Sequence, residues 1–239
     1  MLLRTFGLAR VGGPAAKDLV GAVDLPAYAQ RLLVFLALRP DSGDRALVAG
    51  SLWLDTDEPR AAANLRTALW KVRQVDPELV VGDSRTIRLG PAVSVDLDDA
   101  VAEARREVDG GPGAGPAGLA GLAGAPAPTW ERFRAEVLPQ WYDDWVIVER
   151  ERYRQLRLHA LEALALRLCG QSRYAEAVDA AQAAVAAEPL RETAQRTLIR
   201  VHLAEGNRSE AARQLDRYRD ELRAELGAEP SDSVLALVR

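Results

Sequence analysis

The chain has 239 residues and a formal net charge of −4, and apolar residues make up 48% of the sequence. This length favours two domains, and the acidic balance argues against a protein that coats nucleic acid indiscriminately. Cys169 is the only cysteine, so no intrachain disulfide can form, and we expect it to be buried in an apolar helical run. Because there is neither an 18-residue apolar span nor a signal peptide, we expect a cytoplasmic protein that does not enter the membrane.

The first part of the chain predicts short strands and then helices. Residues 2–11 and 19–23 read as strands separated by a Gly-Gly-Pro turn. An apolar helix is predicted over residues 28–38, and a second over residues 45–54. Asp44 stands where it can cap the second of these helices.

After a break at residues 55–59, the segment 60–74 predicts a helix with one buried face. Its apolar side chains recur at the spacing of a core-facing helix: Ala61, Leu65, Ala68, Leu69 and Val72. The segment carries four cations and no acid. The other face presents groups that can neutralise phosphates or read base edges: Arg60, Asn64, Arg66, Thr67, Lys71, Arg73 and Gln74. We predict a DNA-recognition helix, and the alternative is an ordinary solvated helix face.

Within this face, Thr67 and Lys71 are four residues apart and are expected to reach the floor of a major groove. The arginines are expected to lie toward the groove walls. Trp70 also points outward, and its expected contact stays open between sugar, a neighbouring protomer and the wing.

Residues 79–89 predict a β-hairpin, because an apolar pattern surrounds a Gly-Asp-Ser turn with Arg85 near its tip. Three helices followed by a hairpin predict a winged helix, and the short strands before them match the response-regulator type, which we expect over residues 1–96. In this arrangement the third helix enters the major groove, and Arg85 reaches the adjacent minor groove or backbone.

The charges divide between the two halves of the chain. Residues 1–96 sum to +1, whereas residues 97–239 sum to −5. Phosphate would repel the acidic half, so we expect residues 97–239 to bind protein rather than DNA.

The second half begins with a predicted helix over residues 97–108 and a Gly/Ala/Pro segment over about 109–128. We expect this segment to be a flexible loop, since it cannot bury enough apolar surface to offset its backbone entropy. It contains a formal GxGxxG match at residues 113–118, but no strand precedes the match. We therefore expect no nucleotide site there, and the rest of the sequence predicts no cofactor either.

The remainder repeats with the 34-residue period of tetratricopeptide helices. The pair Glu176-Ala177 recurs as Glu210-Ala211, and the same offset relates Ala160 to Ala194 and Leu164 to Leu198. Residues 130–148 are expected to pack on these repeats as an additional irregular element. The repeats are expected to present a face to a partner; the alternative is that they only stabilise a dimer or pack on the winged helix.

Other clusters receive structural interpretations. The aromatic and acidic residues at 141–145 are expected to anchor a loop to a helix rather than to form a cation-binding box. His159 and His202 lack partners at metal-ligand spacing, and we expect them to be partly buried packing residues. No catalytic motif is present, so we predict no enzyme, no catalytic residue and no metal site.

Several segments together resemble the SARP-type activators, the antibiotic-regulatory family of actinobacteria. They are FGLARV, RLLVFLALRP, SLWLDTDEPRAAANLRTALWKVRQ, WYDDWVIVERERYRQLRLHALEALAL and LGAEPS. The resemblance implies a winged helix joined to a bacterial transcriptional activator domain of tetratricopeptide-like repeats. It further implies binding to direct repeats in double-stranded promoter DNA and recruitment of RNA polymerase.

We therefore expect a mainly α fold with a small β component, formed by an N-terminal winged helix (1–96) and a helical repeat domain (97–239). The predicted function is sequence-specific transcriptional activation. We expect a homodimer on DNA, because one recognition helix rarely discriminates enough between its site and the rest of a genome. The alternative is a helical-repeat scaffold that does not bind DNA.

Overall fold

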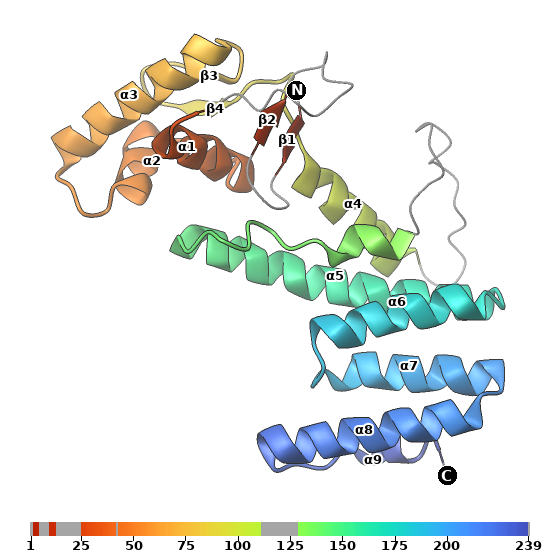
Figure 1. Cartoon of the computed structure of the whole chain (residues 1–239). Coiled ribbons are helices and arrows are strands. Elements are labelled where there is room, and N and C mark those ends of the chain that lie inside the picture. The colour runs from red at the N-terminus through yellow and green to blue at the C-terminus, as the bar shows by residue number, and fades with distance from the viewer. Residues whose placement is uncertain (1, 5–9, 13–24, 42, 111–128, 239) are drawn as a thin grey trace. The chain divides into compact units, whose positions relative to one another are not determined.

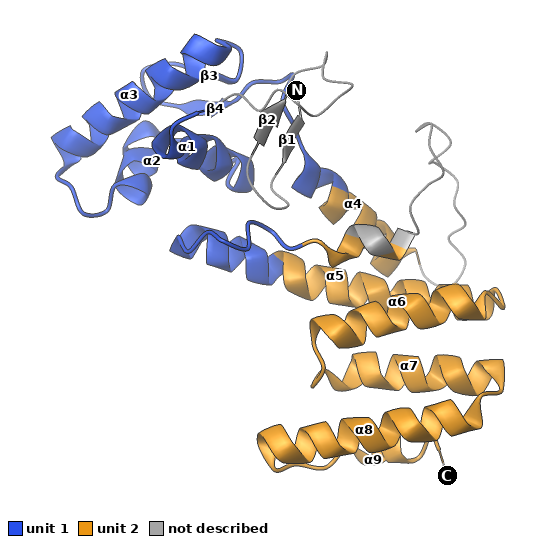
Figure 2. Cartoon of the chain, in the orientation of Figure 1, with its two compact units in different colours: residues 1–99, 136–152 blue, residues 100–135, 153–239 orange. Residues whose placement is uncertain are grey.

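The structure is a computed structural model that describes residues 2–4, 10–12, 25–41, 43–110 and 129–238 (Figure 1). The chain divides into two compact units (Figure 2). Unit 1 comprises residues 1–99 and 136–152, and unit 2 comprises residues 100–135 and 153–239. Helices dominate and the strands are short, which confirms the predicted fold class.

A small sheet in unit 1 contains β1 (Leu2–Arg4), β2 (Arg10–Gly12) and β5 (Ser94–Val95). β1 lies in the middle, antiparallel to β2 and parallel to β5. The single strand predicted over 2–11 is therefore wrong in detail, because its two ends are separate strands that pair with each other. The strand predicted over 19–23 lies outside the described residues.

Helices α1 (Ala27–Leu38), α2 (Arg45–Leu52) and α3 (Glu58–Val75) form the body of unit 1. α1 is buried along most of its length, and α3 packs against both α1 and α2. The predicted cap of α2 is confirmed, since the Asp44 carboxylate accepts two backbone N–H bonds of the first turn, each 3.0 Å long. The hairpin is confirmed as β3 (Val80–Gly82) antiparallel to β4 (Ile87–Leu89), which completes a winged helix.

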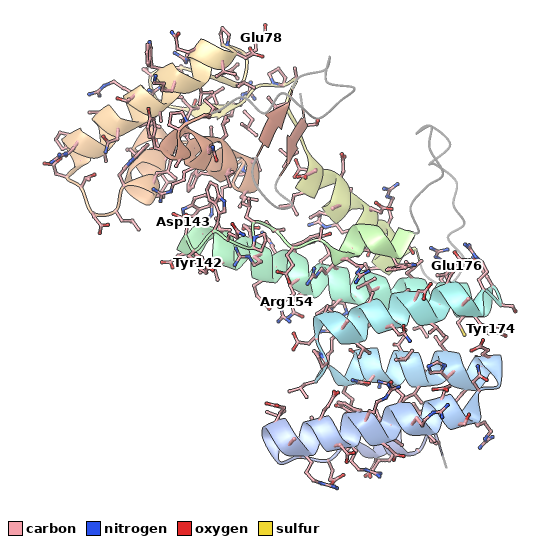
Figure 3. The ribbon with its side chains drawn as sticks, in the orientation of Figure 1. Glu78, Tyr142, Asp143, Arg154, Tyr174 and Glu176 are labelled. Atoms are coloured by element: carbon pink, nitrogen blue, oxygen red, sulfur yellow. The ribbon has the colours of Figure 1, made fainter. Side chains whose placement is uncertain are left out.

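The start of α5 (Asp144–Gly170) and the segment before it also belong to unit 1. Trp145 is buried and meets Phe35 of α1 edge to face, with 5.2 Å between ring centroids. Asp143 precedes α5 and is labelled in Figure 3. It forms an ion pair with Arg31 of α1. These contacts confirm the packing anchor. They also correct the expectation that all of residues 130–148 would pack on the repeats.

Unit 2 is helical, and α6, α7 and α8 lie side by side in chain order (Figure 1). It contains the later part of α5, the end of α4 (Asp96–Asp109), η2 (Thr129–Arg134), α6 (Tyr174–Ala187), α7 (Glu192–Glu205), α8 (Arg208–Leu226) and α9 (Asp232–Leu235).

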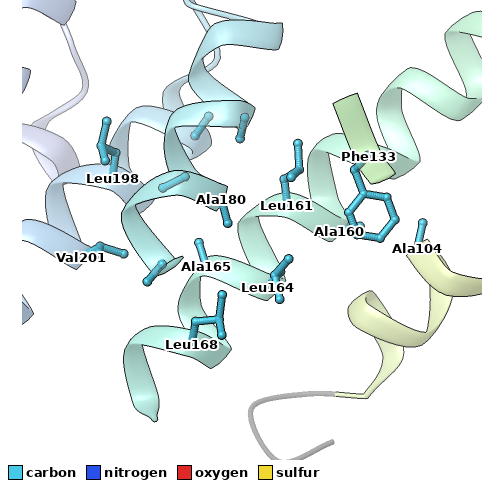
Figure 4. Close-up of a cluster of buried hydrophobic side chains, with 14 residues drawn as sticks. Ala104, Phe133, Ala160, Leu161, Leu164, Ala165, Leu168, Ala180, Leu198 and Val201 are labelled. Carbon is cyan, nitrogen blue, oxygen red and sulfur yellow. The ribbon is translucent and has the colours of Figure 1, made fainter. Parts of the chain in front are cut away.

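The 34-residue repeat is confirmed by burial. The alanines at the repeated positions are fully buried: Ala160, Ala177, Ala194 and Ala211. Phe133 of η2 packs beside Ala160 and Ala104, so the 3-10 segment closes one end of this core (Figure 4).

Two side chains of unit 2, those of His159 and Cys169, are less buried than expected, whereas His202 is buried as expected. His159 is exposed on α5, where its ring lies 3.3 Å from the guanidinium of Arg191, so the prediction of a packing residue is wrong for it. His202 is buried. Cys169 is partly rather than fully buried, and burial raises the pKa of its thiol.

Candidate nucleic-acid interface

α3 has one buried and one exposed face. The Asp57 carboxylate accepts a hydrogen bond from the backbone N–H of Arg60 (2.9 Å), and Pro59 occupies the first turn, where a missing N–H does no harm. The buried side chains are those of the predicted stripe: Ala61, Leu65, Ala68, Leu69 and Val72. The opposite face is therefore the one that can meet a ligand.

The predicted site residues of α3 lie on or beside this exposed face. The exposed ones are Arg60, Arg66, Thr67, Arg73 and Gln74, and the half-buried ones are Asn64 and Lys71. Lys71 is thus less central than its spacing suggests.

Trp70 occupies the centre of the exposed face. Its side chain is 55% exposed, and the Lys71 ammonium lies over the indole, 4.8 Å from the ring centroid. The Thr67 hydroxyl donates a hydrogen bond to the Ala63 carbonyl (3.1 Å). The lone pairs of Thr67 Oγ1 can still accept a hydrogen bond from a base edge.

Arg85 lies in the wing turn, the residues between β3 and β4, which Asp83 organises. The Asp83 carboxylate accepts hydrogen bonds from the backbone N–H groups of Thr86 (2.8 Å) and Arg85 (2.7 Å). These bonds, led by that from Thr86, lower the pKa of Asp83. Gly82 has a φ of +153°, and a Cβ there would lie 2.1 Å from the Thr86 carbonyl oxygen, so the turn requires glycine.

Hydrogen bonds tie the wing turn to the start of α2. The backbone N–H of Arg45 donates to the Arg85 carbonyl (2.9 Å), and the Arg45 guanidinium donates to the Asp83 carbonyl (3.1 Å). Asp44 and Thr86 also form an isolated antiparallel bridge. The turn that carries Arg85 is therefore fixed relative to the helices of unit 1.

A surface cavity of about 750 Å³ lies between α2, α3 and the wing turn. One arginine from each of these elements lines it, namely Arg45, Arg66 and Arg85. Two acidic residues, Asp44 and Glu58, also line it, and the Asp44 carboxylate caps α2. Three arginines from three segments at one cavity suit the binding of an anionic group such as phosphate.

Sequence reasoning missed Arg45. The first turn of α2 contains no acidic residue, and a cation there opposes the helix dipole, which favours negative charge at the N-terminus. A cation placed against this preference, next to a predicted cap, was the signal that could have identified it.

In the described part of the chain, no cluster of three or more His, Cys, Asp or Glu side chains could hold a metal ion. Among the helices described, none has the length and apolar character needed to cross a membrane.

Residues 119–239, about half of the chain, match the family model described as "Bacterial transcriptional activator domain". No curated protein matches the sequence.

Among solved structures, the chain is similar to EmbR of Mycobacterium tuberculosis, solved in complex with a low-affinity phosphopeptide. The TM-score is 0.69 at 16% sequence identity, and the match covers 99% of this chain. At this identity the likeness concerns the fold. The chain spans 63% of the length of the EmbR chain.

Proposed function

Because the chain belongs to the bacterial transcriptional activator domain family and is a transcriptional activator of the SARP kind, we propose that it binds promoter DNA sequence-specifically through α3 and the wing. Its family and fold are those of a regulator rather than of an enzyme. In this proposal residues 1–96 form the DNA-binding domain. Residues 97–239 contact RNA polymerase, a second protomer, or both.

The exposed face of α3 is the observation that carries the proposal. It combines arginines, which neutralise phosphates, with Thr67 and Gln74, which can bond base edges. The apolar stripe anchors the opposite face in unit 1, so α3 presents this surface as a rigid element.

The cavity supports a division of roles within unit 1. Arg45, Arg66 and Arg85 line one cavity, where a phosphate of the DNA backbone would lie near three arginines. Phosphate contacts set orientation on the duplex, whereas the side chains on the rest of α3 read sequence.

Two protomers on direct repeats are proposed from the interface size and the family resemblance. A single winged helix presents a modest surface, so a pair of adjacent half-sites supplies the discrimination that a genome requires. The acidic charge of residues 97–239 keeps that part away from phosphate and available to protein partners.

A salt titration of DNA binding tests this function. Duplexes selected by the full chain from promoter fragments are titrated at rising salt, alongside a random duplex. We expect a steep negative slope of log affinity against log salt, and tighter binding to the selected duplex. No binding to either duplex would leave the helical-repeat scaffold as the better description.

Spacer variants test the arrangement on direct repeats. Recognition helices on half-sites roughly 10–11 bp apart lie on one face of the duplex. Inserting about five base pairs should rotate the protomers to opposite faces and abolish cooperativity. Cooperative footprints that tolerate this half-turn insertion would refute the side-by-side arrangement.

A further inference from the structure

Trp70 is surrounded by the side chains to which the proposed function assigns DNA contact. On a helix, residues three and four positions apart are neighbours, so Trp70 lies next to Arg66, Thr67, Arg73 and Gln74. All four are exposed. Any duplex that meets this face of α3 therefore meets Trp70 as well.

The indole offers an apolar surface at a place where the rest of the face is polar or charged. The side chain is 55% exposed, although its size favours burial. Lys71 lies over one face of the ring, 4.8 Å from its centroid, and the indole still keeps more than half of its surface exposed for another contact. A ligand with an apolar group would bury this surface.

In the major groove the apolar group on a base edge is the thymine C5-methyl. We propose that Trp70 contacts a thymine methyl in each half-site and makes the protein prefer thymine at that position. This inference rests on the proposed function and adds the chemistry that the central side chain of α3 recognises.

The charges around Trp70 favour DNA over a second copy of this chain as the occupant. Arg66 and Arg73 flank the indole, with Lys71 against it. If two α3 faces met each other, these cations would be brought together and would repel. The polyanionic duplex has the complementary charge.

The test removes only the methyl group. In a duplex selected by the wild-type chain, each thymine is replaced in turn by deoxyuridine, and the affinities of wild type and Trp70→Ala are measured in a double-mutant cycle. For wild type, one replacement per half-site should weaken binding about fourfold, the value for burying one methyl-sized group. Trp70→Ala should weaken binding to the thymine duplex about tenfold and should be insensitive to that same replacement.

Leu47→Ala is the matched control, because Leu47 is 52% exposed on α2 and does not line the cavity. It should keep wild-type affinity and wild-type discrimination between thymine and deoxyuridine. Because both side chains are exposed, thermal unfolding should show that both variants stay folded.

The outcomes separate the inference from the proposed function. If Trp70→Ala keeps the wild-type preference for thymine at every position, or loses affinity equally for selected and random duplexes, the methyl contact is overturned while DNA binding stands. If Trp70→Ala instead loses self-association with no change in single-site affinity, the occupant is a second copy and the inference is overturned. If the wild-type chain binds no duplex, both fail.

Discussion

Replacing Arg85 by alanine tests whether the wing touches the phosphate backbone. The Arg85 side chain is exposed, and no hydrogen bond or ion pair of its guanidinium is found among the described residues, so the unbound protein should lose little stability. Each phosphate contact adds about 0.9 to the slope of log affinity against log salt. We therefore expect Arg85→Ala to flatten the slope by about one unit on specific and random duplexes alike. As salt rises from roughly 50 to 200 mM, the fold loss of DNA affinity caused by Arg85→Ala should therefore shrink by a factor of about three to four.

The assay is fluorescence anisotropy of a labelled duplex with the full-length chain across this salt range. Arg208→Ala is the matched control, since it removes the same charge from an exposed position at the start of α8 in the acidic part of the chain. Its slope should equal that of wild type. An unchanged slope for Arg85→Ala would mean that the wing does not touch DNA. Equal flattening in both variants would mean that overall charge, not a contact, sets the slope.

Three further predictions concern the reading face, the wing turn and the helical core. Thr67→Ala and Lys71→Ala should each weaken binding to the specific duplex by about 1–3 kcal/mol and to random DNA by less, measured by gel shift. Asp83 has a lower pKa in the folded protein than in the unfolded chain, so its stabilising effect is present above the unfolded pKa and is lost as pH falls through the folded value. Amide exchange at Arg85 and Thr86, corrected for intrinsic rates, should therefore accelerate at acid pH. Phe133→Ala should lower the free energy of unfolding by about 3–5 kcal/mol in urea, because the ring is 1% exposed among close-packed helices.

Each of these has a contrary result. Equal losses on both kinds of DNA would reassign Thr67 and Lys71 to backbone contact. Asp83→Asn should loosen the wing turn at neutral pH, and exchange in that variant as slow as in wild type would show that the carboxylate does not organise the turn. A loss below about 1 kcal/mol for Phe133→Ala would show that the repeat core does not depend on η2.

Features with a strong local period could be predicted from the sequence. The stripe of α3 is buried as its spacing indicates, and the alanines 34 residues apart are buried as a tetratricopeptide repeat requires. In both cases the spacing along the chain places these side chains on the face that packs, so their burial can be predicted without knowing a distant partner.

Features that depend on distant partners could not be predicted. β5 has two residues and no alternation of its own, and it becomes a strand because β1 pairs with it. Trp145 was expected to be an anchor, but nothing in its own segment indicates that Phe35 would be its partner.

Within the candidate site, the sequence gives the composition of the face more reliably than its centre. Lys71 and Trp70 are neighbours in the sequence and both lie outside the apolar stripe, so the helix period does not show which of them is more exposed. In the structure Trp70 is exposed and Lys71 is half-buried. Arg45 became visible only when the hairpin brought the wing turn against the start of α2, since it precedes Asp83 and Arg85 by about forty residues in the sequence.

The bonds that join α2 to the wing turn bear on the entropy of association. Many proteins reach the minor groove with arms that become ordered only on binding, at about 1–2 kcal/mol for each backbone residue that is fixed. Here hydrogen bonds to the Asp83 carboxylate and from the Arg45 backbone already tie the loop to the fold in the unbound chain. Immobilising Arg85 on DNA then requires ordering of its side chain alone. Because the wing is preorganised, it should not adapt to the groove it meets. We expect weaker binding to duplexes whose minor-groove width does not match the wing.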